Sequence, residues 1–327
     1  MSDQVDQEME RTYIIEANEL TKRFGEEVAV NNMKLDIPEG AIFGLIGPSG
    51  CGKTTTIRLM TGIYEPTSGD INVMGIAPIN FSSADREKIG YLVQGYVFYP
   101  DLTVWENLNF AASFYGVTPF RRKRLNKLLD FVELSEHKGK TSQVLSGGMN
   151  RRLSLAASLV HNPTLLFLDE PTAGIDPILR RKFWDYFKEL QAEGHTLIIT
   201  TQYVGEAAYC DLVGVMSEGK ILTVDTPDGL RRQAYGGDIV SLVADERIEY
   251  EDRVHLQRQP FSIGKVNIVN DYEVDIVVDD ANESIPKIIE SCKEQGLSIK
   301  AIDKKIQPFD DVFVQLIEAQ DGNANDQ

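Results

Sequence analysis

The chain has 327 residues, of which 42% are hydrophobic, and it carries a formal net charge of −17. The length predicts two domains, and the hydrophobic share is ordinary for a globular protein with a sizeable core. The acidic balance argues against a protein that coats DNA or RNA, because neutralising a phosphate backbone requires a basic surface. No apolar run approaches the ~18 residues that a membrane-spanning helix needs, so a role at a membrane would require a partner protein.

The first residues and the cysteines indicate the expected environment. Residues 1–11 are polar and acidic, which predicts a flexible tail rather than a signal peptide. Cys51, Cys210 and Cys292 are scattered and fit no disulfide framework or metal-binding spacing, so we expect a reducing compartment.

Residues 13–22 and 28–37 are predicted to be strands of an N-terminal sheet, joined by a turn near Gly25. Phe24 lies on that turn. Its ring is compatible with stacking on a purine base and equally with packing in the core, and the spacing alone does not decide between them.

Residues 41–46 form an apolar strand pattern that leads into a sequence matching G-x-x-x-x-G-K-[ST]. Glycines allow consecutive backbone N–H groups to point at phosphate oxygens, a lysine adds a mobile cation, and a threonine hydroxyl suits Mg²⁺. A helix over residues 55–63 would direct its positive end at the same phosphates. The candidate nucleotide-binding residues here are Gly47, Pro48, Ser49, Gly50, Cys51, Gly52, Lys53, Thr54 and Thr55.

The next segment is predicted to change from strand to helix. Short strands are expected at residues 71–74 and 89–93, and the second ends at Gln94. Thr103 and Glu106 fit a capping box, and residues 101–140 are predicted to be helical throughout. The basic run at residues 121–124 is interpreted as a solvated helix face, with contact to an acidic loop or anionic headgroups as the alternative.

Two further polar groups stand at the ends of predicted elements. Ser146, Gly147 and Gly148 precede a helix and form a candidate second anion site, although this pattern is also common in loops. The buried strand at residues 164–168 ends in Asp169 and Glu170. Paired carboxylates there are costly unless they hold a metal or take part in chemistry, and the alternative is a pair that faces water.

The remaining pattern predicts an α/β domain followed by a smaller one. Asp176 caps a helix, and the strand at residues 196–200 is followed by Gln202. Strands alternate with helices over residues 40–225, which predicts a largely parallel sheet covered on both faces. Gly236-Gly237 is interpreted as a linker to a small α+β domain over residues 236–319, and residues 320–327 as a disordered tail.

Taken in order over residues 12–232, these motifs resemble those of the nucleotide-binding subunit of an ABC transporter. Its motifs correspond to the phosphate loop 47–54, Gln94 in the Q-loop, residues 145–149 as the signature, residues 165–170 as the Walker B strand with its glutamate, and residues 173–176 as the D-loop. The resemblance implies a P-loop NTPase domain of the ABC type, with an N-terminal antiparallel sheet and a helical subdomain at residues 95–160.

Two positions depart from the commonest family pattern. Met149 replaces a glutamine, and Gln202 replaces the switch histidine. Glutamine can donate and accept hydrogen bonds but cannot carry a proton at neutral pH, so a mechanism that needs an imidazole is in doubt. Together with the extra C-terminal domain, these departures resemble the ATPase subunits of daunorubicin-type drug exporters.

The resemblance implies that the chain hydrolyses ATP with Mg²⁺ as cofactor. It assigns the phosphates to Lys53, the metal to Thr54, Gln94 and, through water, Asp169, the attacking water to Glu170, the γ-phosphate to Gln202 and the adenine to Phe24. Two ATPase chains, identical or different, would pair head to tail, with Ser146, Gly147 and Gly148 of one closing over ATP in the other.

The resemblance also implies partners and a location. An integral-membrane permease would be a separate chain, the ATPase would lie on the cytoplasmic face of the cell membrane, and nucleic acid is not expected. Residues 95–100 are rich in aromatics, and they would receive a permease loop or, alternatively, cap the helical core. Two other functions stay open: a non-transport ABC ATPase of nucleic-acid maintenance or ribosome-associated work, and an importer ATPase with a regulatory C-terminal domain.

Overall fold

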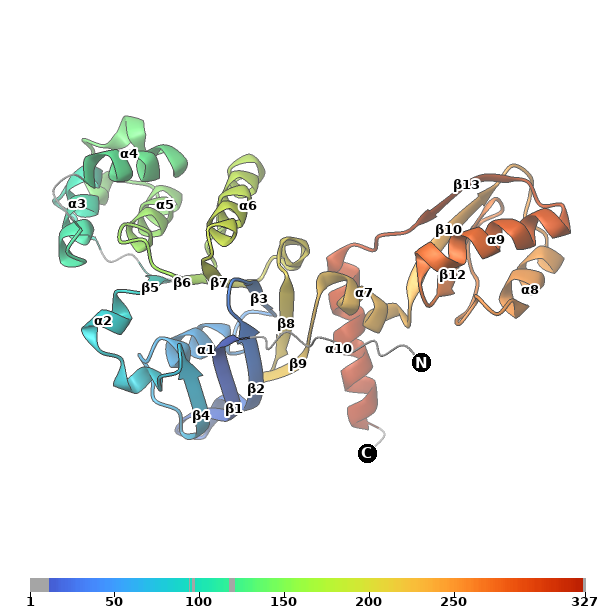
Figure 1. The fold of residues 1–327 in the computed structure, drawn as a ribbon, viewed down its shortest axis with the longest axis horizontal. Helices are drawn as coiled ribbons and strands as arrows, with labels where there is room; N and C mark the ends of the chain where they lie inside the picture. Colours follow the sequence, from blue (N-terminus) through green and yellow to red (C-terminus); the bar gives the residue numbers. More distant parts are fainter. Residues whose placement is uncertain (1–11, 94, 96–97, 118–120, 326–327) are drawn as a thin grey trace, which may run out of the picture. The chain divides into compact units, whose positions relative to one another are not determined.

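A computed structural model describes residues 12–93, 95, 98–117 and 121–325, and of residues 320–325 only the backbone. The contacts divide the chain into two compact units, Met1–Val224 and Asp225–Gln327, which Figure 1 shows in blue to yellow and in yellow to red. Within the described residues, no helix is both long and apolar enough to cross a bilayer.

The first unit contains a six-stranded sheet in the order β5-β6-β7-β3-β8-β9. Every pairing from β5 to β8 is parallel. Strands β3, β6 and β7 are buried along their whole length, because a parallel sheet is covered on both faces. This confirms the predicted α/β class. The bounds are β3 Ile42–Ile46, β5 Ile89–Leu92, β6 Leu165–Asp169, β7 Thr196–Thr201, β8 Leu212–Ser217 and β9 Lys220–Asp225.

A second sheet with antiparallel pairing, in the order β2-β1-β4, forms the N-terminal part of this unit. Its strands are β1 Tyr13–Phe24, β2 Glu27–Pro38 and β4 Ser68–Val73. Side chains of this sheet share one hydrophobic cluster with helix α1 (Lys53–Met60) and with the central sheet, including Leu20, Ile57 and Phe167. The shared core therefore fixes α1, and the loop before it, between the two sheets.

The other helices of the described first unit lie between residues 78 and 209. They are α2 Ser83–Arg86, α3 Val104–Phe114, α4 Arg122–Phe131, α5 Gly147–Ser158 and α6 Pro177–Ala192, with 3-10 turns η1 Pro78–Asn80, η3 Ser135–His137, η4 Ser142–Val144 and η5 Val204–Tyr209. The Thr103–Glu106 capping box is confirmed, with the Glu106 N–H donating to Thr103 Oγ1 at 3.2 Å.

The prediction of a continuous helix over residues 101–140 is wrong. Gly116, with φ of 63°, follows α3 in the left-handed region that ends helices, and α4 begins only at Arg122. The basic run is also only partly solvated. Arg121 Nη2 donates to Ser113 Oγ at 2.8 Å and Arg124 Nη2 to the Leu159 carbonyl at 2.7 Å, so two of its four cations tie α4 to neighbouring helices.

The second unit is an antiparallel sheet in the order β11-β12-β10-β13 with helices around it. Its core contains Val240, Ile276 and Ile288. The elements are α7 Pro227–Tyr235, β10 Asp238–Ala244, α8 Tyr250–Arg258, β11 Asn267–Asn270, β12 Glu273–Val278, α9 Ala281–Gln295, β13 Ile299–Lys304 and α10 Phe309–Asn325.

The boundary of this unit lies earlier than Gly236-Gly237. Gly236 is the left-handed C-cap of α7, and α7 packs against α10 within the same unit. The Arg231 guanidinium lies 4.6 Å from the ring centroid of Phe309, which joins the two helices. Helix α10 continues to Asn325, past residue 319, where the sequence predicts a disordered tail.

Candidate functional site

Three of the polar groups named from the sequence lie at one edge of the central sheet. Strands β6, β7 and β3 are neighbours, with Asp169 in register with Thr200 and Ile46 in register with Thr201. The loop 47–52, the pair Asp169-Glu170 and Gln202 therefore follow adjacent parallel strands at their carboxyl ends. This is where open α/β sheets bind ligands. Gln94 follows β5, the next strand in the sheet, but it lies outside the described residues.

Close approach of backbone explains the glycines of the loop. A Cβ on Gly47 would lie 2.2 Å from the Met216 carbonyl oxygen, and one on Gly52 would lie 2.3 Å from that of Ala29. Gly52 has φ of 110° and is the N-cap of α1. Helix α1 begins at Lys53 and ends at Met60, so the predicted helix at 55–63 is displaced towards the N-terminus. Thr54 and Thr55 lie in its first turn.

The Lys53 ammonium is enclosed by this loop. Lys53 is 5% exposed, and its Nζ donates to the carbonyls of Gly47 at 2.8 Å and Pro48 at 2.9 Å. No carboxylate of the described residues forms an ion pair with it. The third partner of Lys53 Nζ is the Cys51 Sγ at 3.8 Å. A buried cation without a carboxylate partner is costly, and this arrangement fits a loop that binds an anion. Burial raises the pKa of the neighbouring Cys51 thiol, so this cysteine stays protonated.

Asp169 is fully buried at the end of β6. Its Oδ1 accepts a hydrogen bond of 2.5 Å from the Thr200 hydroxyl, while its Oδ2 has no hydrogen-bond partner in the part of the chain that the structure describes. A buried carboxylate oxygen without a donor fits a hydrated cation. No group of three His, Cys, Asp or Glu side chains that could hold a metal occurs among the described residues.

Glu170 adopts a backbone conformation that non-glycine residues rarely use. Its φ is 52°. The Glu170 N–H donates to the carbonyl and to the hydroxyl oxygen of Thr200, each at 3.0 Å. Arg151 Nη2 donates to the carbonyls of Asp169 and Glu170. Strain of this kind costs about 1–3 kcal/mol and is concentrated at functional sites, so it supports a chemical role for Glu170.

Sequence reasoning missed Thr200 and Arg151. Both act on the backbone or side chains of the Asp169-Glu170 pair, from β7 and from α5. For Thr200, the sequence contained one indication: a hydroxyl residue at the end of a strand that was expected to lie in the same sheet as the carboxylates. It has little weight alone, because threonine is also a common strand residue.

The signature residues form the start of helix α5, as predicted. Ser146 is its N-cap and accepts the Met149 N–H at 3.3 Å, and both Ser146 and Gly147 are exposed. A Cβ built on Gly148 would lie 3.6 Å from the Gly174 carbonyl oxygen. The signature therefore lies beside the segment 173–176, in which Asp176 caps α6.

Phe24 and Gln202 present exposed side chains. The Phe24 ring is 43% exposed and meets Tyr64 edge-on at 5.2 Å, with Lys22 Nζ 5.2 Å from its centroid. The core alternative for Phe24 is therefore wrong, whereas stacking on a base stays a prediction. Gln202 is exposed in the turn directly after β7.

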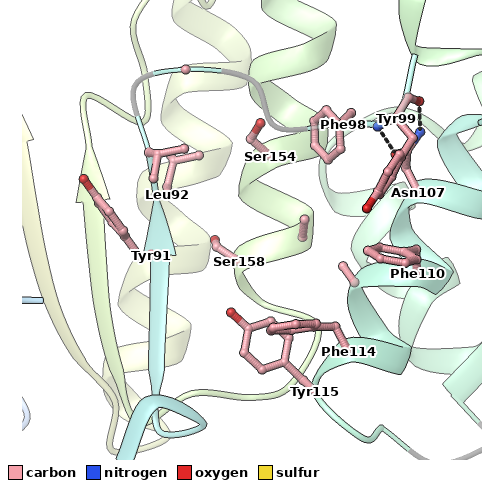
Figure 2. A pocket seen from close by; sticks show the side chains of 14 residues that line it. Tyr91, Leu92, Phe98, Tyr99, Asn107, Phe110, Phe114, Tyr115, Ser154 and Ser158 are labelled. Atoms are coloured by element: carbon pink, nitrogen blue, oxygen red, sulfur yellow. Dashed lines mark hydrogen bonds between the residues drawn. The ribbon is translucent and has the colours of Figure 1, made fainter. Parts of the chain in front are cut away.

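An apolar groove of about 330 Å³ lies between β5, α3 and α5. Figure 2 shows Tyr91 and Leu92 on one side, Ser154 and Ser158 of α5 behind, and the rings of α3 on the other side. Asn107 is 3% exposed and bonds both the N–H (2.9 Å) and the carbonyl (3.1 Å) of Tyr99, which fixes the loop above α3. The groove also contains Val93, Gly95, Phe98, Phe110, Ala111, Phe114, Tyr115 and Ala157.

The groove rings are not buried in a helical core. Phe114 is 77% exposed, Tyr99 51% and Phe110 48%. Within residues 95–100, however, Tyr99 is exposed and Phe98 is half-buried, so both interpretations of this stretch, a permease contact and a cap on the helical core, stay predictions. Tyr96 and Val97, which belong to the same aromatic stretch of the sequence, lie outside the described residues.

A family model described as ABC transporter matches residues 30–173. The chain is 39% identical over 222 residues to a probable multidrug ABC transporter ATP-binding protein, YbhF, of Escherichia coli (strain K12), covering 68% of this chain and 38% of YbhF. It is 32% identical over 280 residues to the linearmycin resistance ATP-binding protein LnrL of Bacillus subtilis (strain 168), covering 85% of this chain and 88% of LnrL. It thus spans about two fifths of YbhF and most of LnrL.

Solved structures give the same result over about two thirds of the chain. An ATP-binding subunit of an ABC transporter matches with a TM-score of 0.63 and 27% identity, over 68% of this chain and 93% of that one. A dimeric post-hydrolysis state of the cassette MJ0796, bound to ADP and Pi, matches with a TM-score of 0.60 and 26% identity, over 65% of this chain and 98% of that one. Sequence and fold agree, and the resemblance drawn from the motifs is confirmed: the chain belongs to the family of ABC transporter ATP-binding proteins.

Proposed function

We propose that this chain is the ATP-hydrolysing subunit of an ABC exporter that drives a separate membrane permease. The observation that carries this proposal is the enclosed Lys53 cation, which has no carboxylate partner among the described residues and follows β3, two strands away from β6 with its buried Asp169 and adjoining Glu170. The names of the relatives favour export, since they refer to multidrug transport, linearmycin resistance and Nod factor export.

The phosphates of ATP would bind in the loop 47–54. Charged phosphate oxygens are stronger acceptors than the carbonyls of Gly47 and Pro48, so Lys53 would exchange those partners for the β- and γ-phosphates. The N–H groups at the start of α1 would add to the positive potential. Phe24 would stack on the adenine, with its exposed ring as the supporting observation.

The residues that would hold Mg²⁺ are Thr54, Gln94 and, through water, Asp169. The open Oδ2 of the buried Asp169 supports this assignment. When bound, Mg²⁺ neutralises negative charge on the β- and γ-phosphates during transfer. Glu170 would polarise the attacking water, and Gln202 would donate a hydrogen bond to the γ-phosphate without exchanging a proton.

Two ATPase chains, identical or different, would pair head to tail. Ser146, Gly147 and Gly148 would then close over ATP held by the other chain, and the exposure of Ser146 and Gly147 at a helix N-terminus supports this role. ATP binding would stabilise the closed pair, and hydrolysis would release it.

The apolar groove between β5, α3 and α5 would receive a loop of the permease. Its exposed rings are those of Tyr99, Phe110 and Phe114, which would lose water-exposed apolar surface on binding. The ATPase would thus lie on the cytoplasmic face of the cell membrane. Val93 and Gly95, the neighbours of Gln94 in the sequence, line the groove. A movement of the permease loop would therefore change the position of Gln94 at the predicted metal site.

The proposal is tested by purifying the tagged chain from gently solubilised membranes and identifying its partners by mass spectrometry, with ATP hydrolysis assayed on the same sample. We expect a polytopic permease in near-equal amount and Mg²⁺-dependent turnover. Recovery with ribosomal or DNA-repair proteins, and no permease, would contradict transport while leaving ATP hydrolysis intact. A periplasmic-type binding protein in the complex would favour import instead.

A further inference from the structure

One arginine of helix α6 contacts three separate segments of the first unit. Arg180 lies one turn after the N-cap Asp176. Its Nη2 donates to the Ile175 carbonyl at 3.3 Å, its guanidinium carbon lies 4.3 Å from the ring centroid of Tyr203, and its Nε lies 3.6 Å from Oε1 of Glu206. None of these contacts is required to form α6. They indicate that Arg180 holds α6, the segment before it and the segment 203–206 in position relative to one another.

Glu206 explains why Arg180 is held in this position. It is 3% exposed in the 3-10 turn η5, and neither of its carboxylate oxygens has a hydrogen-bond partner among the described residues. A buried carboxylate needs a cation nearby, and within the described part of the chain Arg180 is the cation that pairs with it. The pair therefore fixes the guanidinium at the start of η5.

Arg180 also supports the turn that presents Gln202. Tyr203 follows Gln202 directly, and its N–H donates to Thr201 Oγ1 at 3.0 Å. The Tyr203 carbonyl in turn accepts the Glu206 N–H at 2.9 Å. Gln202 is thus held between the buried Thr201 and a tyrosine whose ring lies under the guanidinium.

The third contact reaches the neighbourhood of the signature. Ile175 belongs to the segment 173–176, and the preceding carbonyl oxygen, of Gly174, lies 3.6 Å from where a Cβ on Gly148, at the start of α5, would be. A line of contacts therefore runs within one chain from Gly148 through Ile175 and Arg180 to the Gln202 turn.

We propose that Arg180, with Glu206 as its buried counter-ion, is a positioning residue for ATP hydrolysis that sets the turn carrying Gln202 relative to the segment 173–176. This inference rests on the proposed ATPase function and on the assignment of Gln202 to the γ-phosphate. Among the described residues no hydrogen bond or ion pair joins Arg180 to the loop 47–54, so we expect its loss to lower kcat and to leave KM for ATP unchanged. Lysine is not expected to replace Arg180. Its ammonium is a point charge that cannot stack on the Tyr203 ring while it also donates to the Ile175 carbonyl and pairs with Glu206.

The experiment compares steady-state ATP hydrolysis, affinity for a non-hydrolysable ATP analogue and thermal melting in full-length variants. Arg180→Lys keeps a cation beside Glu206, and the double variant Arg180→Met/Glu206→Met removes both charges so that neither is left buried alone. Arg181→Met is the matched control, since Arg181 is the adjacent, exposed arginine of the same helix.

We expect kcat to fall roughly 10- to 100-fold in both Arg180 variants, with KM and analogue affinity at wild-type values, because small displacements of a positioned group cost up to about 100-fold. In a Gln202→Ala background the same substitutions should cause no further loss, since the effect acts through Gln202. Arg181→Met should behave as wild type.

Wild-type turnover in the double variant would overturn the inference about Arg180 and leave the proposed ATPase function intact. The same conclusion would follow if the Arg180 substitutions lowered kcat in the Gln202→Ala background as much as in the wild-type background. A wild-type chain that binds but does not hydrolyse ATP would overturn the proposed function as well. The two failures are therefore distinguished by the wild-type rate.

Discussion

The Thr200 hydroxyl, at the end of β7, donates a hydrogen bond of 2.5 Å to the buried Oδ1 of Asp169, at the end of β6. The same hydroxyl oxygen accepts the Glu170 N–H at 3.0 Å. One side chain thus orients the carboxylate assigned to the metal and the backbone of the residue assigned to water. Buried charge-assisted bonds of this kind contribute about 1.5–3 kcal/mol.

Replacing Thr200 by valine should therefore weaken both functions of the pair. Thr200→Val keeps the shape and removes the donor, so we expect a loss of about 1–3 kcal/mol in the free energy of unfolding and a higher Mg²⁺ concentration for half-maximal ATP hydrolysis. Urea unfolding and a Mg²⁺ titration of the rate measure the two effects. Thr172→Val is the control, because the buried Thr172 hydroxyl has no hydrogen-bond partner among the described residues. Equal behaviour of the two variants would contradict the role of Thr200.

Glu170→Gln should remove the group that polarises the attacking water. We expect kcat to fall roughly 10²- to 10⁴-fold while the affinity for ATP stays unchanged, because general-base catalysis contributes that much and the phosphates bind elsewhere. Single-turnover hydrolysis and equilibrium nucleotide binding separate the two. Glu189→Gln, an exposed change on α6, is the control. Wild-type turnover in Glu170→Gln would show that the assigned role is wrong.

The loop 47–54 was predictable because its pattern specifies local needs. Gly47 and Gly52 have no space for a Cβ, and Lys53 and Thr54 have the chemistry of a phosphate and metal site. The parallel strands were predictable from their uninterrupted apolar runs. These features depend on residues close together in the chain.

What the sequence did not reveal depends on pairing between distant segments. Thr200 and Arg180 look like an ordinary strand residue and an ordinary helix residue until β6, β7 and η5 are placed beside them. Helix α8 was missed because Leu256 is its one buried side chain, so it has no apolar stripe. The end of α3 was missed because the left-handed Gly116 interrupts an otherwise helical composition.

Asp176 should make the stability of α6 depend on pH in the acid range. The Leu179 N–H, with that of Ile178, lowers the pKa of its carboxyl below the ordinary value. A depressed folded pKa means that the contribution is complete above the unfolded pKa of about 3.9 and is lost as pH falls through the folded pKa. The urea midpoint of wild type should exceed that of Asp176→Ala at neutral pH, and the difference should shrink below pH ~4. Asp185→Ala, an exposed change on the same helix, is the control for removing an acidic side chain from α6.

Phe24 should contribute to base binding through its exposed ring. Stacking of a base on an aromatic side chain is worth about 1–3 kcal/mol, so Phe24→Ala should raise the Kd for ATP roughly 5- to 150-fold, while Phe24→Trp preserves it. The Kd for inorganic triphosphate, which has no base, should be the same in all three proteins. A uniform weakening of ATP and triphosphate would indicate a folding defect instead of lost stacking.

Phe114 should matter for assembly and not for nucleotide chemistry. Its ring is 77% exposed and lines the groove between β5, α3 and α5, so Phe114→Ser removes apolar contact area without opening the core. We expect the recovered amount of co-purified permease to fall while ATP binding by the isolated chain stays at the wild-type level, because hydrophobic contacts at the centre of an interface contribute most of its affinity. Ile63→Ser, at an exposed apolar side chain outside the groove, is the matched control and should retain the permease. If the two variants recovered equal amounts of permease, the docking surface would lie elsewhere. The groove aromatics would then serve packing within this chain.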